Sequence, residues 1–241
     1  MRISVLIPAF NEERLLGESL RQVHAAMAAF TRRRWDTELI VCDNNSTDTT
    51  AQVARAAGAT VVFEPVNQIA RARNRGAEAA TGDWLIFVDA DTHPSAALFD
   101  DVATQIESSR CLAGGCTIRL EQGYLAGSVI TGLWNTVSRV MHWAAGSFIF
   151  CDTAAFRKIG GFDINLFVSE EIDLSKRLKK LARTERKRIV ILHRHPILTS
   201  ARKLRLYTAR EHFAFMVKST LRPRKTMTNR EECHPWYDGR R

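Results

Sequence analysis

No apolar run in this chain of 241 residues is long enough for a membrane-spanning helix, which takes roughly 20 residues. The chain also lacks a basic leader and a small-residue cleavage site, and it runs directly into the apolar segment Ile3–Ile7. We therefore expect a strand there and not a signal peptide. There is no internal repeat and no low-complexity tract. These absences favour a globular protein that works in the cytoplasm.

Cysteine is scarce, with five residues, an odd number. The short spacing from Cys111 to Cys116 comes without a partner histidine, so the pattern of a zinc site is missing. Several cysteines lie in apolar runs that are typical of strands. We expect buried, reduced thiols, in agreement with a cytoplasmic setting.

Acidic residues are scarce in one region. From Lys176 to Lys225 the chain has 17 lysines and arginines against two acids, Glu185 and Glu211, while the whole chain carries a net charge of +9. Such a cationic third attracts an anionic partner: a nucleotide diphosphate, a phospholipid surface or a nucleic acid. A solvated helix face explains part of the excess. The composition, 45% hydrophobic and 25% charged, is that of a globular protein with a sizeable core.

Short apolar strands alternate with helices along the first 92 residues. The predicted strands are 3–7, 38–42, 60–63 and 84–88, and the predicted helices are 12–29, a segment ending near Ala57, and 69–81. Alternation of this kind is typical of a mostly parallel sheet with right-handed crossovers. The sequence therefore predicts an α/β protein with a Rossmann-like central sheet flanked by helices.

The pattern loosens after residue 92. The elements predicted there are a helix from about Pro94, a strand near 112–120, an apolar stretch over 123–143, a strand at 147–151, a short helix at 153–159, a helix from about Glu170 and a last core strand at 189–193. From about Lys203 we expect one amphipathic basic helix and a polar tail.

Two carboxylates, Asp89 and Asp91, directly follow the apolar run Trp84–Val88. In open α/β sheets, ligands bind beyond the carboxyl ends of the strands. Carboxylate oxygens suit Mg²⁺ or Mn²⁺, which are usually held by one or two carboxylates and the phosphates of a substrate. The alternative is that one of these aspartates only caps the helix that begins near Pro94.

Polar side chains also follow the first two strands, in the loops Pro8–Glu12 and Asp43–Asp48. Short polar residues at that edge can hydrogen-bond a base and a ribose while a helix N-terminus faces phosphate. The alternative is that Asn11, Ser46 and Thr47 cap the helices that follow. Capping does not explain Asp43.

Two cationic stretches are candidates for contacts with phosphate. Three arginines at alternate positions, Arg71, Arg73 and Arg75, cannot share one helix face, and we expect Arg73 to face the nucleotide. The stretch Thr199–Lys203, with Arg202, follows two histidines and offers hydroxyls and cations that could hold a diphosphate.

Three acids, Glu170, Glu171 and Asp173, open the helix that begins near residue 170. The helix dipole favours acids in a first turn, and this alone could explain Glu170. The cluster also supplies a candidate general base.

Six motifs in this order and spacing, along about 200 residues, resemble those of the family 2 glycosyltransferases. They are Ser4–Glu13, Val41–Asp48, Ala72–Gly76, Asp89–Asp91, Gly160–Asp163 and Glu170–Leu174. The resemblance implies the GT-A fold, a nucleotide-diphospho-sugar donor (UDP-, GDP- or dTDP-linked), a divalent metal (Mn²⁺ or Mg²⁺) and inversion at the anomeric carbon. It implies a glycosyltransferase domain over 1–202, with a nucleotide-sugar half over about 1–92 and an acceptor half over about 93–202, followed by the basic helix and tail at 203–241.

The resemblance also implies roles for single residues. Asp91 corresponds to the metal ligand, with Asp89 beside it on ribose or metal, and Glu171 corresponds to the base, where the family usually has Asp. The nucleotide pocket would comprise Pro8, Ala9, Phe10, Glu12, Asp43 and Asn45. Many members have a second Asp and then Gly where this chain has Asn44 and Asn45, which leaves the identity of the base open.

The acceptor is less defined, and a glycan or a lipid-linked acceptor is expected. The aromatic residues over 123–150 suit sugar rings, a lipid chain or an ordinary core. The helix near 203–221 is compatible with peripheral contact at the inner face of a membrane.

Two other functions are less consistent with these motifs. A sugar nucleotidyltransferase would need a glycine-rich, basic loop after the first strand, which Pro8–Glu12 is not. A nucleic-acid-binding protein would leave the acidic motifs unexplained, because carboxylates repel phosphate.

Overall fold

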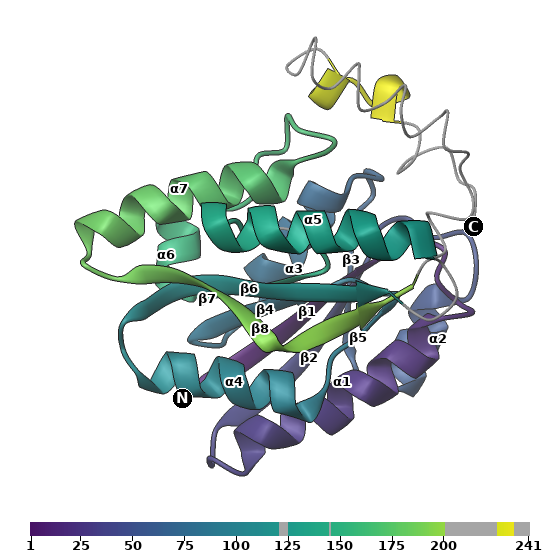
Figure 1. The fold of residues 1–241 in the computed structure, drawn as a ribbon. Helices are drawn as coiled ribbons and strands as arrows, with labels where there is room; N and C mark the ends of the chain where they lie inside the picture. Colours follow the sequence, from purple (N-terminus) through teal and green to yellow (C-terminus); the bar gives the residue numbers. More distant parts are fainter. Residues whose placement is uncertain (121–124, 145, 201–225, 234–241) are drawn as a thin grey trace.

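The computed structural model describes residues 1–120, 125–144, 146–200 and 226–233, and it has one eight-stranded sheet with helices on both faces (Figure 1). The strands are β1 (Arg2–Ala9), β2 (Asp36–Asp43), β3 (Thr60–Phe63), β4 (Trp84–Val88), β5 (Thr92–His93), β6 (Cys111–Leu120), β7 (Phe148–Asp152) and β8 (Arg188–Thr199). The helices are α1 (Leu16–Thr31), α2 (Thr50–Ala56), α3 (Ile69–Ala79), α4 (Ala96–Glu107), α5 (Leu125–Met141), α6 (Thr153–Lys158) and α7 (Glu170–Thr184), with a 3₁₀ helix, η1, at Glu231–Cys233.

The strand order is β3-β2-β1-β4-β7-β6-β8-β5. β1 pairs in parallel with β2 and β4, β2 pairs in parallel with β3, and β6 pairs in parallel with β8. β7 is antiparallel to both β4 and β6, and β5 is antiparallel to β8. This arrangement confirms the predicted mostly parallel, mixed sheet.

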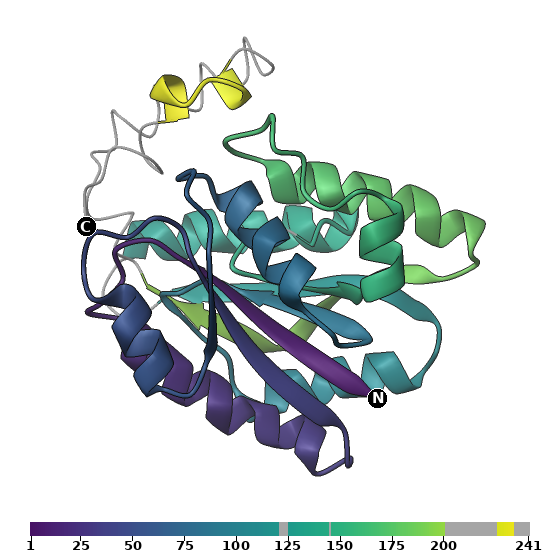
Figure 2. The same ribbon diagram turned by 180° about the vertical axis from the view of Figure 1, so that it is seen from behind.

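Two apolar layers hold the helices to the sheet. α1, α2 and α4 cover one face, and α3, α5, α6 and α7 cover the other (Figures 1 and 2). Ile3, Val5 and Ile7 on β1 pack in the first layer, whereas Leu6 packs in the second with Phe87 of β4. Successive side chains of a strand point to opposite faces, and both faces are buried at the centre of the sheet, so β4 is apolar throughout.

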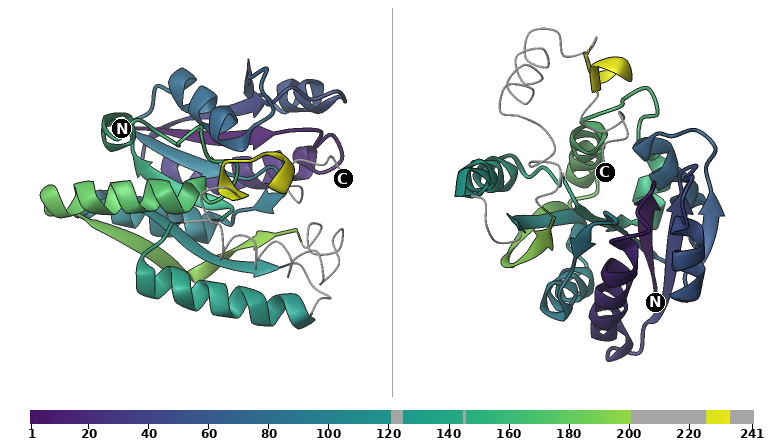
Figure 3. Two further views of the ribbon diagram at one scale, coloured as in Figure 1. Left: turned by 90° about the horizontal axis from the view of Figure 1, so that it is seen from above. Right: turned by 90° about the vertical axis from the view of Figure 1, so that its right-hand side faces the viewer.

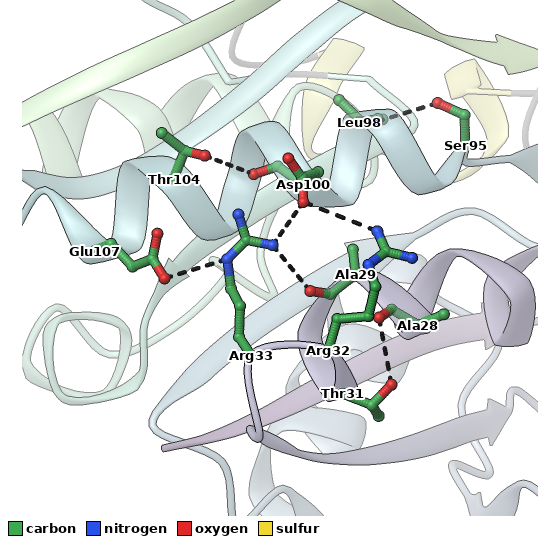
Figure 4. A network of polar contacts seen from close by, with 10 residues as sticks. All are labelled: Ala28, Ala29, Thr31, Arg32, Arg33, Ser95, Leu98, Asp100, Thr104 and Glu107. Carbon is green, nitrogen blue, oxygen red and sulfur yellow. Dashed lines mark hydrogen bonds and ion pairs between the residues drawn. The ribbon is translucent and has the colours of Figure 1, made fainter.

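A polar network also joins the end of α1 to α4 (Figure 4). Nη1 of Arg33 donates to Oδ1 of Asp100 at 2.6 Å, and its Nε donates to Oε1 of Glu107 at 3.1 Å. The guanidinium also donates to the carbonyl of Ala29 at 3.0 Å and so closes the end of α1. Bonding to Arg33 lowers the pKa of Asp100 below its ordinary value.

The predicted strands are confirmed, but some boundaries differ. α1 begins at Leu16 and not at residue 12, because the amides of Leu15 and Leu16 both donate to the carbonyl of Glu12 in a turn. β8 continues to Thr199 instead of ending near residue 193. Its exposed middle includes His193 and resembles a loop in sequence, and the pairing with β6 shifts register there.

The five cysteines are all buried and unpaired, as predicted. Burial raises the pKa of Cys42 and Cys111 to about 12. Among the residues described above, no helix is both long and apolar enough to cross a membrane. Arg202 and the predicted amphipathic helix at 203–221 lie outside the described residues.

Candidate active site

The two polar loops at the carboxyl ends of β1 and β2 are bonded to each other. The amide of Asn44 donates to the carbonyl of Ala9 at 2.8 Å, and the amide of Asn11 donates to Oγ of Ser46 at 3.0 Å. In return, Oδ1 of Asn11 accepts from the amide of Thr47 at 2.8 Å. The two loops therefore form one surface at the edge of the sheet.

The capping alternatives for these motifs are wrong. The residues that precede α1 and α2 are Leu15 and Thr49, and neither forms a side-chain cap. α4 is capped by Ser95, whose side chain accepts from the amide of Leu98, so neither Asp89 nor Asp91 serves as its cap. Asn11, Ser46 and Thr47 instead bond the two loops to each other, and Asp48 accepts from the amide of Thr50, the first residue of α2.

The predicted nucleotide-binding residues differ in accessibility. Asp43 is buried, and its Oδ1 accepts from the amide of Ser46 at 3.1 Å. Asn45 is exposed in the left-handed conformation, with φ of 64°. Ala9 and Glu12 are buried, while Pro8 and Phe10 are half-buried.

Asn44, where many family members have Asp, has a structural role. Its side chain donates to the carbonyl of Val66 at 2.6 Å and accepts from the amide of Gln68 at 2.9 Å. The side chain is buried and joins the end of β2 to the residues before α3. The amide suits this position because it both donates and accepts.

Asp89 and Asp91 follow β4 at the same edge, close to the end of β8. The amide of Asp89 donates to the carbonyl of Ser147, and the amide of Ser200 donates to the carbonyl of Asp91 at 3.2 Å. Oγ1 of Thr92 lies 3.2 Å from Oγ1 of Thr199. The start of the predicted phosphate-contacting stretch at 199–203 therefore lies beside Asp91.

Four charged residues lie close together near the carboxyl end of β4, and we call them the Arg73 cluster: Arg73, Asp89, Glu170 and Glu171. Nη1 of Arg73 lies 2.9 Å from Oε1 of Glu170 and 3.0 Å from Oε1 of Glu171. Nη2 donates to Oδ1 of Asp89 at 3.0 Å. The guanidinium stacks 5.2 Å from the ring centroid of Phe162. The cluster connects α3, the end of β4 and the start of α7.

Burial and neighbouring charges both shift the pKa values of residues in the Arg73 cluster. Burial alone would lower the pKa of Arg73, but the carboxylates of Glu171, Asp89 and Glu170 raise it above its ordinary value. Burial raises the pKa of Glu170 to about 8, and Glu171 adds to this rise while Arg73 opposes it. The surroundings therefore favour the protonated form of Glu170 and the charged form of Arg73.

The structure gives Arg73 a different environment from the one expected. The sequence predicts that Arg73 faces the nucleotide, but its side chain is 2% exposed and both terminal nitrogens bind carboxylates. Its Nε is buried and has no hydrogen-bond partner among the residues that the structure describes. These contacts favour a positioning role, in which Arg73 orients Asp89 and Glu171.

Asp173, the third predicted catalytic acid, pairs with Arg177 and not with Arg73. Its Oδ2 accepts from Nε of Arg177 at 2.7 Å, one turn along α7. It lines a cavity of about 580 Å³ together with residues of α3 and the loop from Gly160 to Ile164. Of the three predicted catalytic acids, only Glu170 and Glu171 contact Arg73.

Two amide side chains, one directly before α3 and one on it, hold the loop that precedes α7, and the sequence did not single them out. Nε2 of Gln68 donates to the carbonyls of Ile164 and Leu166 at 2.7 and 3.0 Å. Asn74 exchanges two bonds of 2.9 Å with the backbone of Phe162. Asn74 directly follows Arg73 in the sequence, and this position was the available indication that Asn74 has a role near the site.

A match to a family model identifies the chain. Residues 4–156, more than half of the chain, match the model described as glycosyl transferase family 2. The chain belongs to this family. The matched range includes both polar loops, Arg73 and the Asp89–Asp91 segment, whereas Glu170 and Glu171 lie beyond it.

Relatives of this family 2 chain share its fold more than its sequence. An uncharacterized glycosyltransferase of Mycobacterium tuberculosis is 36% identical over 113 residues, or 47% of each chain. TarS 1–349 of S. aureus has a TM-score of 0.66 at 21% identity, covering 98% of this chain and 68% of that one. Mannosyltransferase PcManGT from Pyrobaculum calidifontis, in complex with GDP-Man and Mn²⁺, has a TM-score of 0.66 at 16% identity, covering 93% and 60%. These structures share the predicted GT-A fold.

A divalent metal fits the carboxylates of this family 2 chain. Oδ1 of Asp89 binds Arg73, its side chain is 23% exposed, and the half-buried Asp91 lies two residues further on. Within the described part of the chain, no group of three or more His, Cys, Asp or Glu could hold a metal ion. Such a donor set suits a cation that completes its ligands with waters and substrate phosphates.

Proposed function

We propose that this protein is an inverting, metal-dependent glycosyltransferase that moves a sugar from a nucleotide-diphospho-sugar to an acceptor hydroxyl. The observation that carries the proposal is the convergence of Asp89 and Glu171 on the buried Arg73, next to the polar loops of β1 and β2. Family membership supports the type of reaction. The chain spans about half the length of the curated relative described above, so the activity of a whole relative is not transferred to it.

The donor would bind along the edge where β1, β2 and β4 end. Pro8, Phe10, Asp43 and Asn45 would contact the base and ribose, and buried Ala9 and Glu12 would shape the first loop. TarS fragments bind UDP or UDP-GlcNAc and PcManGT binds GDP-Man, which supports a nucleotide-linked sugar without choosing the base. Arg202, beyond Ser200, would approach the diphosphate.

Asp91, with Asp89, would hold Mn²⁺ or Mg²⁺. When bound, the ion neutralises charge on the leaving diphosphate. The Mn²⁺ in the PcManGT complex supports this choice of ion. The ion pair of Asp89 with Arg73 fixes one carboxylate oxygen and so orients the side chain.

Glu171 is the proposed general base. The acceptor oxygen forms a bond to the anomeric carbon while the bond from that carbon to the diphosphate oxygen breaks, which inverts the configuration. The hydroxyl proton passes to Oε2 of Glu171, the oxygen that the ion pair with Arg73 does not use. Positioned bases of this kind typically contribute about 10²–10⁴-fold to a rate. Glu170, buried beside it, accepts a hydrogen bond from Nη1 of Arg73 and so supports the position of Arg73.

The acceptor half, about 93–202, would bind a glycan or a lipid-linked acceptor, and we expect the enzyme to work in the cytoplasm. A sugar nucleotidyltransferase remains the alternative within nucleotide-sugar chemistry, but the loop Pro8–Glu12 has no glycine to approach a phosphate. The acids of the Arg73 cluster also oppose nucleic-acid binding.

Donor binding measured by calorimetry tests the proposal. UDP-, GDP- and dTDP-linked sugars are titrated with Mn²⁺ and with a chelator, and we expect at least one to bind only with Mn²⁺. Asp91→Asn should weaken that binding about tenfold or more, because the ion loses a charged ligand. Asp36→Asn is the matched control, since Asp36 is an exposed carboxylate at the opposite end of β2. The absence of any donor binding, or equal binding with the chelator, would contradict the proposal.

A further inference from the structure

One face of α5 carries exposed apolar side chains. Leu133 is 68% exposed, Val140 is 70% exposed and Met141 is 42% exposed. These positions are seven and eight residues apart, so they lie along one side of the helix. The exposed Thr136 and Arg139 lie among them, and we call this face of α5 the stripe. Single exposed apolar residues are common on protein surfaces, so the case for a partner depends on the charges that adjoin them.

A cationic cavity of about 430 Å³ adjoins the end of this stripe. Lys179, Arg183, Lys187 and Arg188 line it together with His142, and none of the described lining residues is an acid. Its apolar lining is formed by Ala182 and by three residues of β8, Ile189, Val190 and Ile191. The cavity thus combines positive charge with an apolar floor.

The stripe and the cavity form one continuous surface. Nζ of Lys179 donates to the carbonyl of Met141 at 2.9 Å, which joins α7 to the end of α5. Nζ of Lys176 lies 5.6 Å from the ring centroid of Trp143. α5 and α7 lie on the same side of the sheet (Figure 3). We call this the α5–α7 surface.

The dipole of α7 accounts for only part of the positive charge around this cavity. Cations near the end of a helix are favoured by its dipole, and Arg183 lies in the last turn of α7. Within the described ranges, however, the side chains of Arg183, Lys187 and Arg188 form no salt bridge, and the nearby Glu185 pairs with Lys158. The dipole also gives no reason for the exposed stripe on α5.

We propose that the α5–α7 surface docks on the anionic surface of a phospholipid bilayer. Apolar side chains of a helix that lies in the interface enter the headgroup boundary, while lysine and arginine bind the phosphates. The cavity, with cations above an apolar floor, fits a phospholipid headgroup and the start of its acyl chains. The surface is formed by described residues, is separate from the segment at 203–221, and does not depend on the proposed function.

Vesicle co-sedimentation of the full chain tests this proposal. We expect binding to phosphatidylcholine vesicles that contain phosphatidylglycerol, weak binding to pure phosphatidylcholine, and a loss of binding at high salt. The double variant Lys187→Glu/Arg188→Glu and the double variant Leu133→Ser/Val140→Ser should each weaken binding about tenfold or more. The control is Arg34→Glu/Arg55→Glu, because Arg34 and Arg55 are exposed cations elsewhere on the chain.

Several outcomes would overturn the proposal. One is equal sedimentation with neutral and anionic vesicles, and another is that the control variant loses as much binding as Lys187→Glu/Arg188→Glu. Sedimentation velocity separates a third outcome: if the wild type is a dimer and Leu133→Ser/Val140→Ser is a monomer, a second copy covers the stripe. Thermal unfolding of each variant shows whether it is folded, and the salt dependence of the wild type tests the proposal without any variant.

Discussion

Arg73 is a buried cation that faces three carboxylates, and one positive charge cannot neutralise three negative ones. Burial and the neighbouring Glu171 raise the pKa of Glu170, which favours its uncharged form and so reduces this imbalance. The sequence identified each of these residues singly, but it could not show that they meet. Arg73 and Glu170 are 97 positions apart, and only the folded sheet brings α3 and α7 together. The structural role of Asn44, which the sequence related to the identity of the base, and that of Gln68 were not predicted for the same reason, since their partners lie in other segments.

The raised pKa of Glu170 predicts a pH dependence of stability. The folded state holds a proton that the unfolded state releases above its ordinary pKa of 4.5. The native state therefore binds more protons between pH 4.5 and about 8, and this group makes the free energy of unfolding fall as the pH rises across that range. Glu170→Gln should remove this part of the slope, which urea unfolding at pH 5, 6, 7 and 8 measures. Glu78→Gln, at an exposed glutamate, should keep the slope. An unchanged slope in Glu170→Gln would mean that Glu170 is ionised when folded.

Among the elements, α3 organises the site from both sides. It presents Arg73 to the acids, and Asn74 on α3 holds the loop before α7 together with Gln68, the residue that precedes α3. Apolar runs made the strands predictable, because both faces of this sheet are buried. The extension of β8 was not predictable, because its exposed His193–His195 has the composition of a loop and pairing with β6 decides its conformation.

Two neighbouring glycines test the contact between α3 and this loop. Gly160 and Gly161 both have positive φ, of 80° and 70°. A Cβ on Gly160 would meet nothing within 4 Å, whereas one on Gly161 would lie 2.6 Å from Oδ1 of Asn74. Gly160→Ala should cost about 1–2 kcal/mol from backbone strain alone, and Gly161→Ala should cost about 1–3 kcal/mol more from the clash. Denaturant unfolding measures both, and equal losses would show that Asn74 yields without cost.

The whole molecule joins two differently built halves. Parallel strands β1 to β4 form the side with the polar loops and Asp89, and the part of the chain that contains antiparallel β7 also contains α7 with Glu171. The sequence predicts a nucleotide-sugar half over about 1–92 because helix and strand alternation is regular there, and this division stays a prediction. The central claim is that a donor bound on the first half meets a base supplied by the second.

The variant Glu171→Gln tests this claim most directly, in the presence of Mn²⁺ and of the donor that binds. Calorimetry measures its affinity for the donor. The release of nucleoside diphosphate in the presence of an acceptor glycan measures transfer. Glutamine keeps the shape and the partner of Glu171 but cannot accept the proton. We expect donor affinity to stay near that of the wild type while transfer falls by about 10²–10⁴-fold. Loss of affinity and transfer together would make Glu171 a structural residue, and undiminished transfer would exclude it as the base.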